Sequence, residues 1–234
     1  MTGKTLADFA ITERWKPRNP DNIQLYAFPT PNGVKASIML EETGLPYDAH
    51  TVKLSQTTTP EFLSLNPNNK IPAIIDPHGP GDRPLPLWES GAILIYLAEK
   101  TGRFLPSDTA MRYETIQWLM FQMGGVGPLF GQYGYFAVNA GKEIEDPRPR
   151  ERYRKEAIRL LNVLEGRLRD RDYIMGDDYT IADIATAPWV RTAKVRYEAY
   201  DDLEMDKVPA VMAWLDRCLA RPAVQRGLEQ PPRE

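Results

Sequence analysis

The sequence predicts an α/β first half and an all-helical second half. Between residues 23 and 101, short apolar strand segments alternate with helix-forming segments in the order β-α-β-α-β-β-α. Strands joined by crossover helices pair in parallel, whereas the two adjacent strands near residues 71–88 form an antiparallel edge. We therefore expect a mixed four-stranded sheet. Beyond Pro106 the strand signal disappears and only helical periodicity remains.

The elements of the first half follow from their apolar pattern and their end signals. The predicted strands are Ile23–Phe28, Tyr47–Leu54, Ile71–Asp76 and Leu85–Trp88. The predicted helices are Val34–Thr43, Pro60–Leu65 and Ser90–Thr101. Gly44 and Gly102 follow two of these helices, and glycine is the residue that most easily takes the left-handed conformation after a helix end.

The second half predicts an all-helical domain over residues 108–228, after a linker near Phe104–Asp108. Its helices are expected at Met111–Met123, Arg150–Arg169, Ile181–Tyr197 and Val208–Ala220. The α/β domain is expected over residues 23–103. Residues 1–22 are predicted to form an N-terminal arm, and residues 229–234 a frayed tail because of Pro231 and Pro232.

Composition excludes several classes of function. The chain has 234 residues, with 29 Lys and Arg against 32 Asp and Glu, so its net charge of −3 offers no basic surface for nucleic acid. No stretch approaches the ~20 apolar residues that span a membrane, and no signal peptide is evident, so we expect a soluble, cytoplasmic protein. One cysteine and two histidines predict no intrachain disulfide and no metal site.

Three segments stand where a helix begins or a strand starts. Thr30-Pro31-Asn32-Gly33 precedes the first helix, Asn69-Lys70-Ile71-Pro72-Ala73 leads into the third strand, and Trp88-Glu89-Ser90-Gly91 precedes the third helix. Helix N-termini present free amide groups that bind anions, and an exposed strand backbone can pair with a peptide. The alternative is ordinary turn chemistry, with Asn32 and Ser90 as N-caps and Gly33 relieving backbone strain.

The order of these segments, followed by Tyr179-Thr180-Ile181-Ala182-Asp183-Ile184-Ala185, resembles the cytosolic glutathione transferases. Thr-Pro-Asn-Gly-x-Lys and Leu-Asn-Pro-Asn-Asn-Lys-Ile-Pro-Ala are similar to the Nu class, which contains glutathione-dependent disulfide-bond oxidoreductases. The resemblance extends from about Ile23 to Ala223. It implies a thioredoxin-like N-terminal domain, a helical C-terminal domain and a homodimer.

The resemblance also implies a glutathione site. Ile71 would pair through its backbone with the cysteinyl part of glutathione, with Pro72 in the cis form. Glu89 and Ser90 would hold the γ-glutamyl end, and Lys70 would help neutralise the glycyl carboxylate. The resemblance implies glutathione, reduced or oxidised, as the substrate. It implies no metal.

Two further residues are weaker candidates from the same resemblance. Arg152 of the partner subunit would reach the bound ligand, although residues 148–155 hold five basic side chains and such a run is usually a solvated helix face. Many Nu-class relatives carry a ligand-binding glutamine on a longer loop before the Pro-Glu-Phe segment. Here Gln56 is the residue available on the shorter loop.

The turn before the first helix contains no cysteine, so the reactive sulfur would have to come from glutathione. Cys218 shares a helical stripe with Val211, Trp214 and Leu215, which predicts a buried structural thiol. Lowering a thiol pKa from about 8.5 to about 7 requires about 2 kcal/mol. A helix dipole offers ~0.3–1 kcal/mol and a hydrogen bond to a charged group about 1.5–3 kcal/mol. We therefore assign the hydroxyl of Thr30 and the backbone N–H of Asn32 to the sulfur.

Three functions remain open at this stage. The first is reduction of disulfides by glutathione. The second is conjugation of glutathione to hydrophobic electrophiles, with Gly124–Phe130, Tyr133, Tyr135 and Phe136 as an apolar wall; a kinked helix packed in the core or at a dimer interface is the alternative for that stretch. The third is a binding or scaffold module without catalysis. Asp183 is predicted to be structural, because Thr180-Ile181-Ala182-Asp183 matches a capping box.

Overall fold

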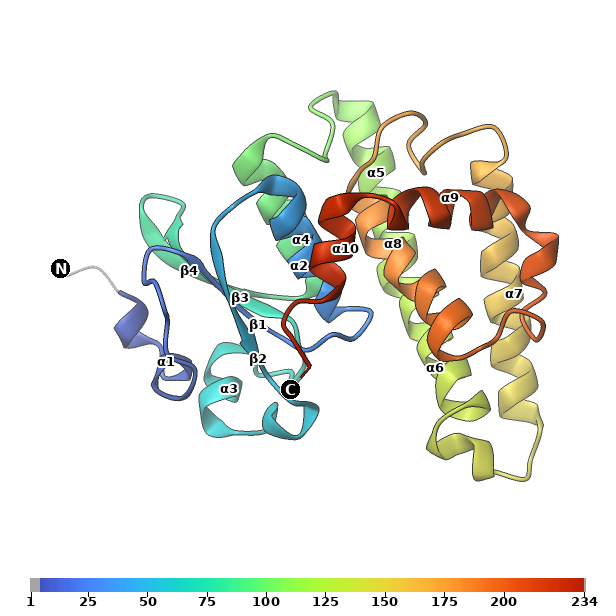
Figure 1. The fold of residues 1–234 in the computed structure, drawn as a ribbon, viewed down its shortest axis with the longest axis horizontal. Coiled ribbons are helices and arrows are strands. Elements are labelled where there is room, and N and C mark those ends of the chain that lie inside the picture. The colour runs from blue at the N-terminus through green and yellow to red at the C-terminus, as the bar shows by residue number, and fades with distance from the viewer. Residues whose placement is uncertain (1–4, 234) are drawn as a thin grey trace. The chain divides into compact units, whose positions relative to one another are not determined.

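The computed structural model describes residues 5–233, and its contacts divide the chain into two compact units. The first unit contains the chain through Thr101 and takes it up again at Pro222, whereas the second unit runs from Gly102 to Arg221. The first unit holds the sheet and the second is all-helical (Figure 1), which confirms the predicted fold class.

The sheet of the first unit has four strands in the order β2-β1-β3-β4. The strands are β1 (Ile23–Ala27), β2 (Tyr47–Thr51), β3 (Ala73–Gly79) and β4 (Arg83–Trp88). β1 and β2 are parallel and β3–β4 is antiparallel, as predicted. The β1–β3 pair is also antiparallel, so the expectation that strands joined by helices are parallel was wrong for β3. All five residues of β1 are buried, as expected for a strand covered on both faces.

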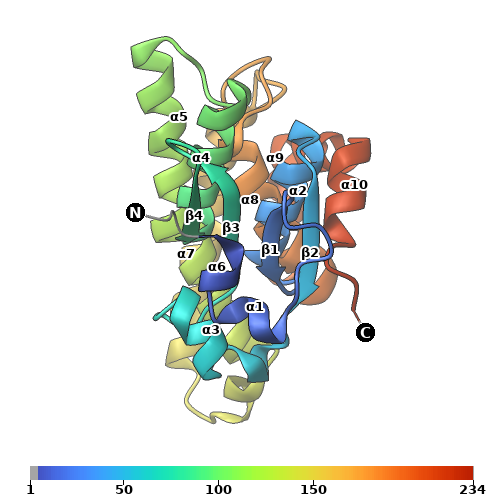
Figure 2. The same cartoon turned by 90° about the vertical axis from the view of Figure 1, so that its left-hand side faces the viewer.

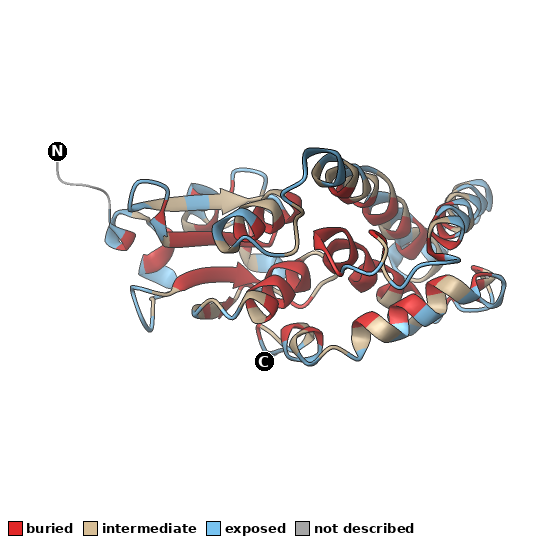
Figure 3. Cartoon of the chain, turned by 90° about the horizontal axis from the view of Figure 1, so that it is seen from above, coloured by how far each residue is buried: buried red, intermediate tan, exposed pale blue. Residues whose placement is uncertain are grey.

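Helices cover both faces of this sheet. The helices of the first unit are α1 (Ile11–Arg14), α2 (Gly33–Thr43), α3 (Pro60–Leu65), α4 (Ser90–Thr101) and α10 (Pro222–Leu228). α2 and α4 lie on one side, and α1 and α3 lie beside each other on the opposite side (Figure 2). Gly44 ends α2 with a φ of 74° and donates its N–H to Leu40 O at 2.9 Å, so the predicted helix end is confirmed. Within each unit the buried residues gather between the layers (Figure 3).

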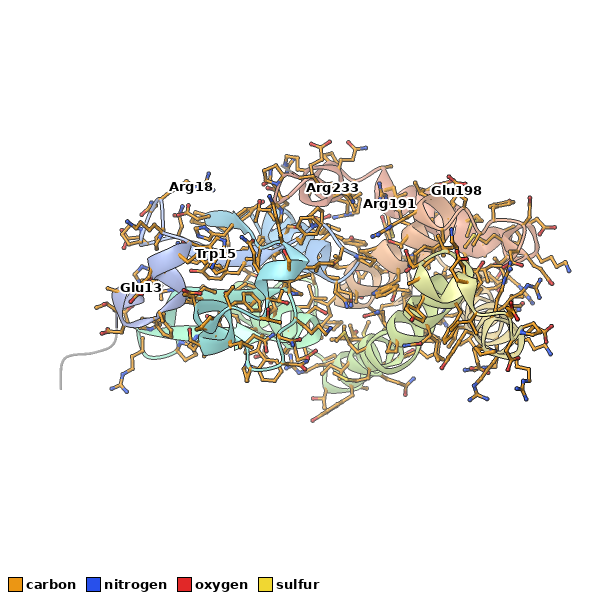
Figure 4. The ribbon with its side chains drawn as sticks, turned by 90° about the horizontal axis from the view of Figure 1, so that it is seen from below. Glu13, Trp15, Arg18, Arg191, Glu198 and Arg233 are labelled. Carbon is orange, nitrogen blue, oxygen red and sulfur yellow. The ribbon has the colours of Figure 1, made fainter. Side chains whose placement is uncertain are left out.

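The described part of the N-terminal arm, residues 5–22, is folded onto the sheet. Leu6 and Ile11 are buried in one apolar cluster with Tyr26 and Phe62. Trp15, which follows α1 (Figure 4), donates from Nε1 to Thr51 O at 3.1 Å. The sequence predicted an arm here rather than a core element, with Trp15 as the residue that could fix it in place, because isolated apolar residues between charges carry no helical or strand period.

Helix α10 returns the end of the chain to the first unit, whereas the sequence assigned it to the helical domain. Ser37 on α2 donates its hydroxyl to Gly227 O at 2.6 Å. A Cβ on Gly227 would lie 2.5 Å from Ile38 Cα, so only glycine permits this close contact between the helices. The chain therefore leaves the helical unit after Arg221 and packs against α2.

The described part of the C-terminal tail, residues 229–233, also contacts the first unit. Thr51 donates its hydroxyl to Pro232 O at 3.2 Å, and Arg233 donates from Nη2 to Pro29 O at 3.3 Å. The sequence predicted a frayed segment here. A tail of prolines lacks its own backbone hydrogen bonds, but its carbonyl groups can still accept from neighbouring side chains.

His50 makes the stability of the first unit depend on pH. Its ring stacks on Tyr26 at 4.8 Å between centroids, and its Nε2 lies 2.8 Å from Gln24 Oε1. Burial lowers the pKa of His50 from 6.5 to about 4, and Asp48 opposes this shift. Between these pH values the unfolded chain binds a proton that the folded chain does not, so the free energy of unfolding falls on acidification by about 2–3 kcal/mol.

We expect the His50→Gln variant to lose this part of the pH dependence. Urea unfolding of both proteins at about pH 4.5 and about pH 7 measures the difference, because every other titrating group is common to them. An equal loss of stability on acidification in both proteins would show that His50 does not carry the effect.

The second unit is built from helices throughout. They are α5 (Thr109–Phe121), α6 (Gly127–Ala137), α7 (Arg148–Leu168), α8 (Ile181–Arg191) and α9 (Pro209–Leu219). Single π-helical turns, Gln122–Val126 and Thr192–Arg196, continue α5 into α6 and extend α8. No helix within residues 5–233 combines the length and apolar character that a bilayer-spanning segment needs.

Candidate functional site

Three predicted segments meet at one end of the sheet. Tyr26 of β1 lies opposite Ala73 of β3, and Ala73 lies opposite Trp88 of β4. Because both pairs are antiparallel, the end of β1, the start of β3 and the end of β4 lie at the same end of the sheet. The segment around Thr30 follows β1, that around Ile71 precedes β3, and Glu89 and Ser90 follow β4, so the sheet brings these segments together.

The turn before α2 is capped by Thr30. Its Oγ1 accepts the N–H of Gly33 at 3.1 Å, and its carbonyl accepts the N–H of Val34 at 3.0 Å. Asn32 is the N-cap residue of α2, as predicted, but its side chain makes no capping hydrogen bond. Pro31 suits the position after the cap because its φ is already helical and its missing N–H is not needed there.

Gly33 is required by a close approach of the backbone rather than by its own conformation. Its φ is not in the left-handed region. A Cβ at this position would lie 1.9 Å from Phe28 O and 3.4 Å from Ile71 Cδ1. The start of α2 is therefore held directly against the end of β1 and against the Ile71 segment.

Thr30 and Asn32 are only half-buried, so a ligand can reach the turn. The Thr30 oxygen already accepts the Gly33 N–H, and its hydroxyl hydrogen remains available as a donor. A hydroxyl donor beside the N-terminus of an 11-residue helix favours an anion or a thiolate.

The second segment is shaped by Asn66, which the sequence analysis did not identify. Asn66 is 1% exposed; its Nδ2 donates to Lys70 O at 2.6 Å and its Oδ1 accepts from Asn68 N at 2.9 Å. The Ile71–Pro72 peptide bond is cis, as the resemblance implied. Ile71 lies before the first ladder pair of β3, whereas the side chain of Lys70 is exposed.

The third segment contains a backbone in an unusual conformation. Glu89 has a φ of 74°, in the left-handed region that few residues other than glycine adopt, and such positions concentrate at functional sites. Its carbonyl accepts the N–H of Ile93 at 3.0 Å, so the cap position of α4 falls on Glu89. Ser90, predicted as the cap, is instead the first helical residue and is 4% exposed.

Lys35 is the lysine of the Thr-Pro-Asn-Gly-x-Lys motif, and the sequence analysis assigned it no role. It belongs to α2, has no exposed surface, and donates from Nζ to Ser90 Oγ at 3.3 Å. Burial lowers the pKa of Lys35 from 10.5 to about 7, and the carboxylate of Glu89 acts in the opposite direction. A lysine within a helix segment that is otherwise made of small and apolar residues was the signal that could have identified it.

Gln56 has a local structural role in its own turn. Its side-chain Oε1 accepts the N–H of Lys53 at 2.9 Å, in the 3₁₀ turn Leu54–Gln56. The side chain is half-buried, and its amide hydrogens remain donors for a ligand.

Arg152 belongs to the second unit, whereas the three segments described above belong to the first. It is exposed near the start of α7. Two neighbouring arginines are held by carboxylates: Arg148 by Asp146 at 2.5 Å and Arg154 by Asp202 at 3.0 Å. Among residues 5–233 no carboxylate forms a close ion pair with Arg152, although Arg152 adds to the effect of Arg159 in lowering the pKa of Glu156.

The glycine-rich stretch of the second unit is used for packing. Phe130 has no exposed surface, and Tyr133 is buried with its hydroxyl donating to Asp202 Oδ2 at 2.6 Å. A Cβ on Gly134 would lie 2.2 Å from the Tyr197 ring, so this glycine permits helix contact. Tyr135 is exposed, and Phe136 stacks on Tyr153. This arrangement favours the packed-helix interpretation over an apolar wall built from Phe130 and Tyr133.

Cys218 is fully buried on α9, as its helical stripe predicted. A buried thiol in apolar surroundings is unreactive. The part of the chain that the structure describes contains no group of three or more His, Cys, Asp or Glu side chains placed to hold a metal ion.

Sequence comparison assigns both halves of the chain to one family. Residues 21–99 match the glutathione S-transferase N-terminal domain, and residues 147–217 match the glutathione S-transferase C-terminal domain. The disulfide-bond oxidoreductase YfcG of Escherichia coli strain K12 is 47% identical over 88% of this chain and 94% of its own length. The disulfide-bond oxidoreductase YghU of the same strain is 40% identical over 92% of this chain and 77% of its own length.

Solved structures agree with this assignment. A glutathione transferase from Burkholderia graminis, with two glutathione molecules bound per subunit, has a TM-score of 0.97 and 59% identity, covering 100% of this chain and 98% of its own. A glutathione transferase from Pseudomonas putida, with one glutathione disulfide bound per subunit, has a TM-score of 0.96 and 56% identity. The match covers 97% of this chain and 100% of that chain. On the fold, the sheet-edge segments and these similarities together, the chain belongs to the glutathione S-transferase family.

Proposed function

We propose that this protein is a Nu-class-type glutathione transferase that reduces disulfide bonds with the thiol of a bound glutathione. The observation that carries the proposal is the meeting, at one end of the sheet, of the turn at Thr30, the backbone at Ile71 and the N-terminus of α4. The turn has no cysteine, so it suits a sulfur brought by a ligand. Relatives named disulfide-bond oxidoreductases, and relatives with two glutathiones or glutathione disulfide bound, support this reading.

In this proposal, Thr30 and Asn32 activate the sulfur. The Thr30 hydroxyl donates to the glutathione thiolate, and the Asn32 N–H at the start of α2 adds a second donor. The Thr30 oxygen is held in place by the Gly33 N–H, so the donor is oriented before the ligand arrives. A preoriented donor loses less free energy on binding than one that must be ordered.

The tripeptide is held by the other two segments. The backbone of Ile71 pairs with the cysteinyl residue, and Pro72 in the cis form sets the direction of that backbone. Glu89 binds the γ-glutamyl ammonium group, while Ser90 and the first amides of α4 bind its carboxylate. Lys70 provides positive charge for the glycyl carboxylate, and Gln56 is a further donor candidate.

The reaction is a thiol–disulfide exchange. The bound thiolate attacks the sulfur of a glutathione mixed disulfide, the old S–S bond breaks, and the released thiolate takes up a proton. One glutathione and one mixed disulfide thus become glutathione disulfide and a free thiol. The α2 N-terminus lowers the pKa of the attacking thiol, which raises the fraction present as thiolate.

The second unit contributes through dimerisation. In the proposed homodimer, Arg152 of the partner subunit reaches the bound ligand and neutralises a carboxylate or the leaving sulfur. Its exposure suits that role. Its neighbours Arg148 and Arg154 are instead paired with Asp146 and Asp202.

Turnover with two substrates tests the proposal. We expect a small glutathione mixed disulfide to be reduced at least about tenfold faster than a model aryl halide is conjugated. The Cys218→Ala variant should keep the same turnover, because its sulfur takes no part, and should lose about 1 kcal/mol of stability through the missing packing.

Other outcomes identify the competing functions. Faster conjugation than reduction would favour the transferase reaction on electrophiles. The lack of calorimetric binding of both reduced and oxidised glutathione would favour a scaffold. Loss of reduction in a folded Cys218→Ala variant would overturn the claim that the working sulfur belongs to the ligand.

A further inference from the structure

Lys35 lies inside the first unit, between the two helices that frame the proposed site. It is the third residue of α2, and its side chain has no exposed surface. Its Nζ reaches Ser90 Oγ, the first residue of α4, at 3.3 Å. One side chain therefore connects the helix that presents the sulfur-activating turn with the helix that binds the γ-glutamyl carboxylate.

Burying a lysine ammonium group costs free energy, which hydrogen bonds and nearby opposite charges must offset. Burial lowers the pKa of Lys35 to about 7, and the Glu89 carboxylate opposes that shift. Glu89 is exposed, and water screens its charge. A second carboxylate placed at Ser90 by a ligand would favour the charged lysine further, and the charged lysine would favour that ligand to the same extent.

The chemistry of the contact also decides which group is the donor and which is the acceptor. An ammonium group has three hydrogens to donate and no lone pair to accept, so Ser90 Oγ is the acceptor in this hydrogen bond. The hydroxyl hydrogen of Ser90 must then point away from Lys35. The first amides of a helix have no acceptor within that helix, so the start of α4 adds donors that suit a carboxylate.

We propose that Lys35 is a positioning residue of the γ-glutamyl subsite, whose buried charge, acting through Ser90, makes the protein select ligands that present a carboxylate at the N-terminus of α4. This inference rests on the proposed glutathione site and adds to it the determinant of carboxylate recognition. Lys35 touches Ser90 and not the sulfur, so it sets ligand selectivity rather than the chemical step.

The selectivity is measured with two ligands and one substitution. The ligands are S-methylglutathione, which has no ionisable thiol, and its analogue with 4-aminobutyrate in place of the γ-glutamyl residue, which lacks only the α-carboxylate. We expect the wild-type protein to bind S-methylglutathione at least about tenfold more tightly than the analogue. In Lys35→Met this ratio should fall at least about fivefold, mainly through weaker binding of S-methylglutathione, as measured by calorimetry.

A matched control separates selectivity from general damage. Lys70→Met removes an exposed lysine assigned to the other end of the tripeptide. It should therefore weaken the binding of both ligands equally and leave the ratio of their affinities unchanged. A merely structural Lys35 would behave in the same way. Methionine has a similar volume to lysine and carries no charge, so Lys35→Met is expected to fold. Lys35→Gln, which keeps a hydrogen-bond donor without the charge, is the second variant. Its ratio of affinities for the two ligands should also fall.

The outcomes distinguish this inference from the function on which it rests. If the wild-type protein does not bind S-methylglutathione, the proposed glutathione site itself fails. If it binds both ligands equally, or if a folded Lys35→Met or Lys35→Gln variant keeps the wild-type ratio, the role of Lys35 is refuted and the glutathione site stands.

Discussion

Replacing Thr30 with valine is expected to lower the turnover of a glutathione mixed disulfide by about tenfold or more. Valine has the shape of threonine but no hydroxyl, so the thiolate loses a hydrogen bond of about 1.5–3 kcal/mol. The helix dipole that remains offers only ~0.3–1 kcal/mol, too little to hold the thiol half ionised near pH 7. Steady-state reduction of the mixed disulfide at saturating glutathione measures the effect.

The control for this variant must account for the second role of Thr30. Its oxygen also caps α2 by accepting the N–H of Gly33, so valine is expected to lower stability by about 1 kcal/mol as well. Thr30→Ser keeps both the cap and the donor and should retain most of the turnover. Near-normal turnover in Thr30→Val, with the same glutathione affinity as the wild type, would remove Thr30 from the chemical step.

The largest expected effect on stability is that of Asp183→Ala, which should lower the free energy of unfolding by about 3–5 kcal/mol. Asp183 has no exposed surface and accepts hydrogen bonds from Ile174 N, Thr180 N and Trp214 Nε1 at 2.8–2.9 Å. Alanine would leave three buried donors without an acceptor, and each unsatisfied group costs about 1–3 kcal/mol. Urea unfolding monitored by tryptophan fluorescence measures the loss.

Two smaller substitutions in the same capping box are expected to lower the free energy of unfolding by less. Thr180→Ala removes the capping oxygen that accepts from Ala182 N at 3.3 Å and the hydroxyl that donates to Asp183 Oδ2 at 3.2 Å, and should cost about 1 kcal/mol. Asp183→Asn keeps one acceptor oxygen and should fall between the two. If Asp183→Ala costs no more than Thr180→Ala, then the capping box accounts for the stability and the contacts to Ile174 and Trp214 add nothing.

The features predicted correctly from the sequence are those with local signals. The strand and helix order, the glycine that ends α2 and the Thr180–Asp183 capping box each depend on residues a few positions apart. The three site segments could likewise be located, because a helix start or a strand start marks each of them. Their meeting at one end of the sheet depends on two antiparallel pairs. The β3–β4 pair was predicted, but the β1–β3 pair was not, because strands joined by helices were expected to be parallel.

The features that sequence reasoning missed depend on contacts between distant segments. The requirement for Gly33 comes from the carbonyl of Phe28, and the burial of Lys35 comes from α4 closing over α2. Neither leaves a periodic pattern in the chain. The same holds for α10, whose return to α2 depends on a glycine that permits contact with Ile38.

The pKa of the thiol of bound glutathione tests the central claim most directly. It is obtained by titrating the ultraviolet absorbance of the thiolate in the complex, with Cys218→Ala as the background protein so that no other thiol contributes. The account predicts a pKa near or below about 7, compared with about 8.5 for a free thiol, and a return toward the free value when Thr30→Val is added. A bound thiol that titrates like free glutathione, or one whose lowered pKa is unchanged by Thr30→Val, would contradict it.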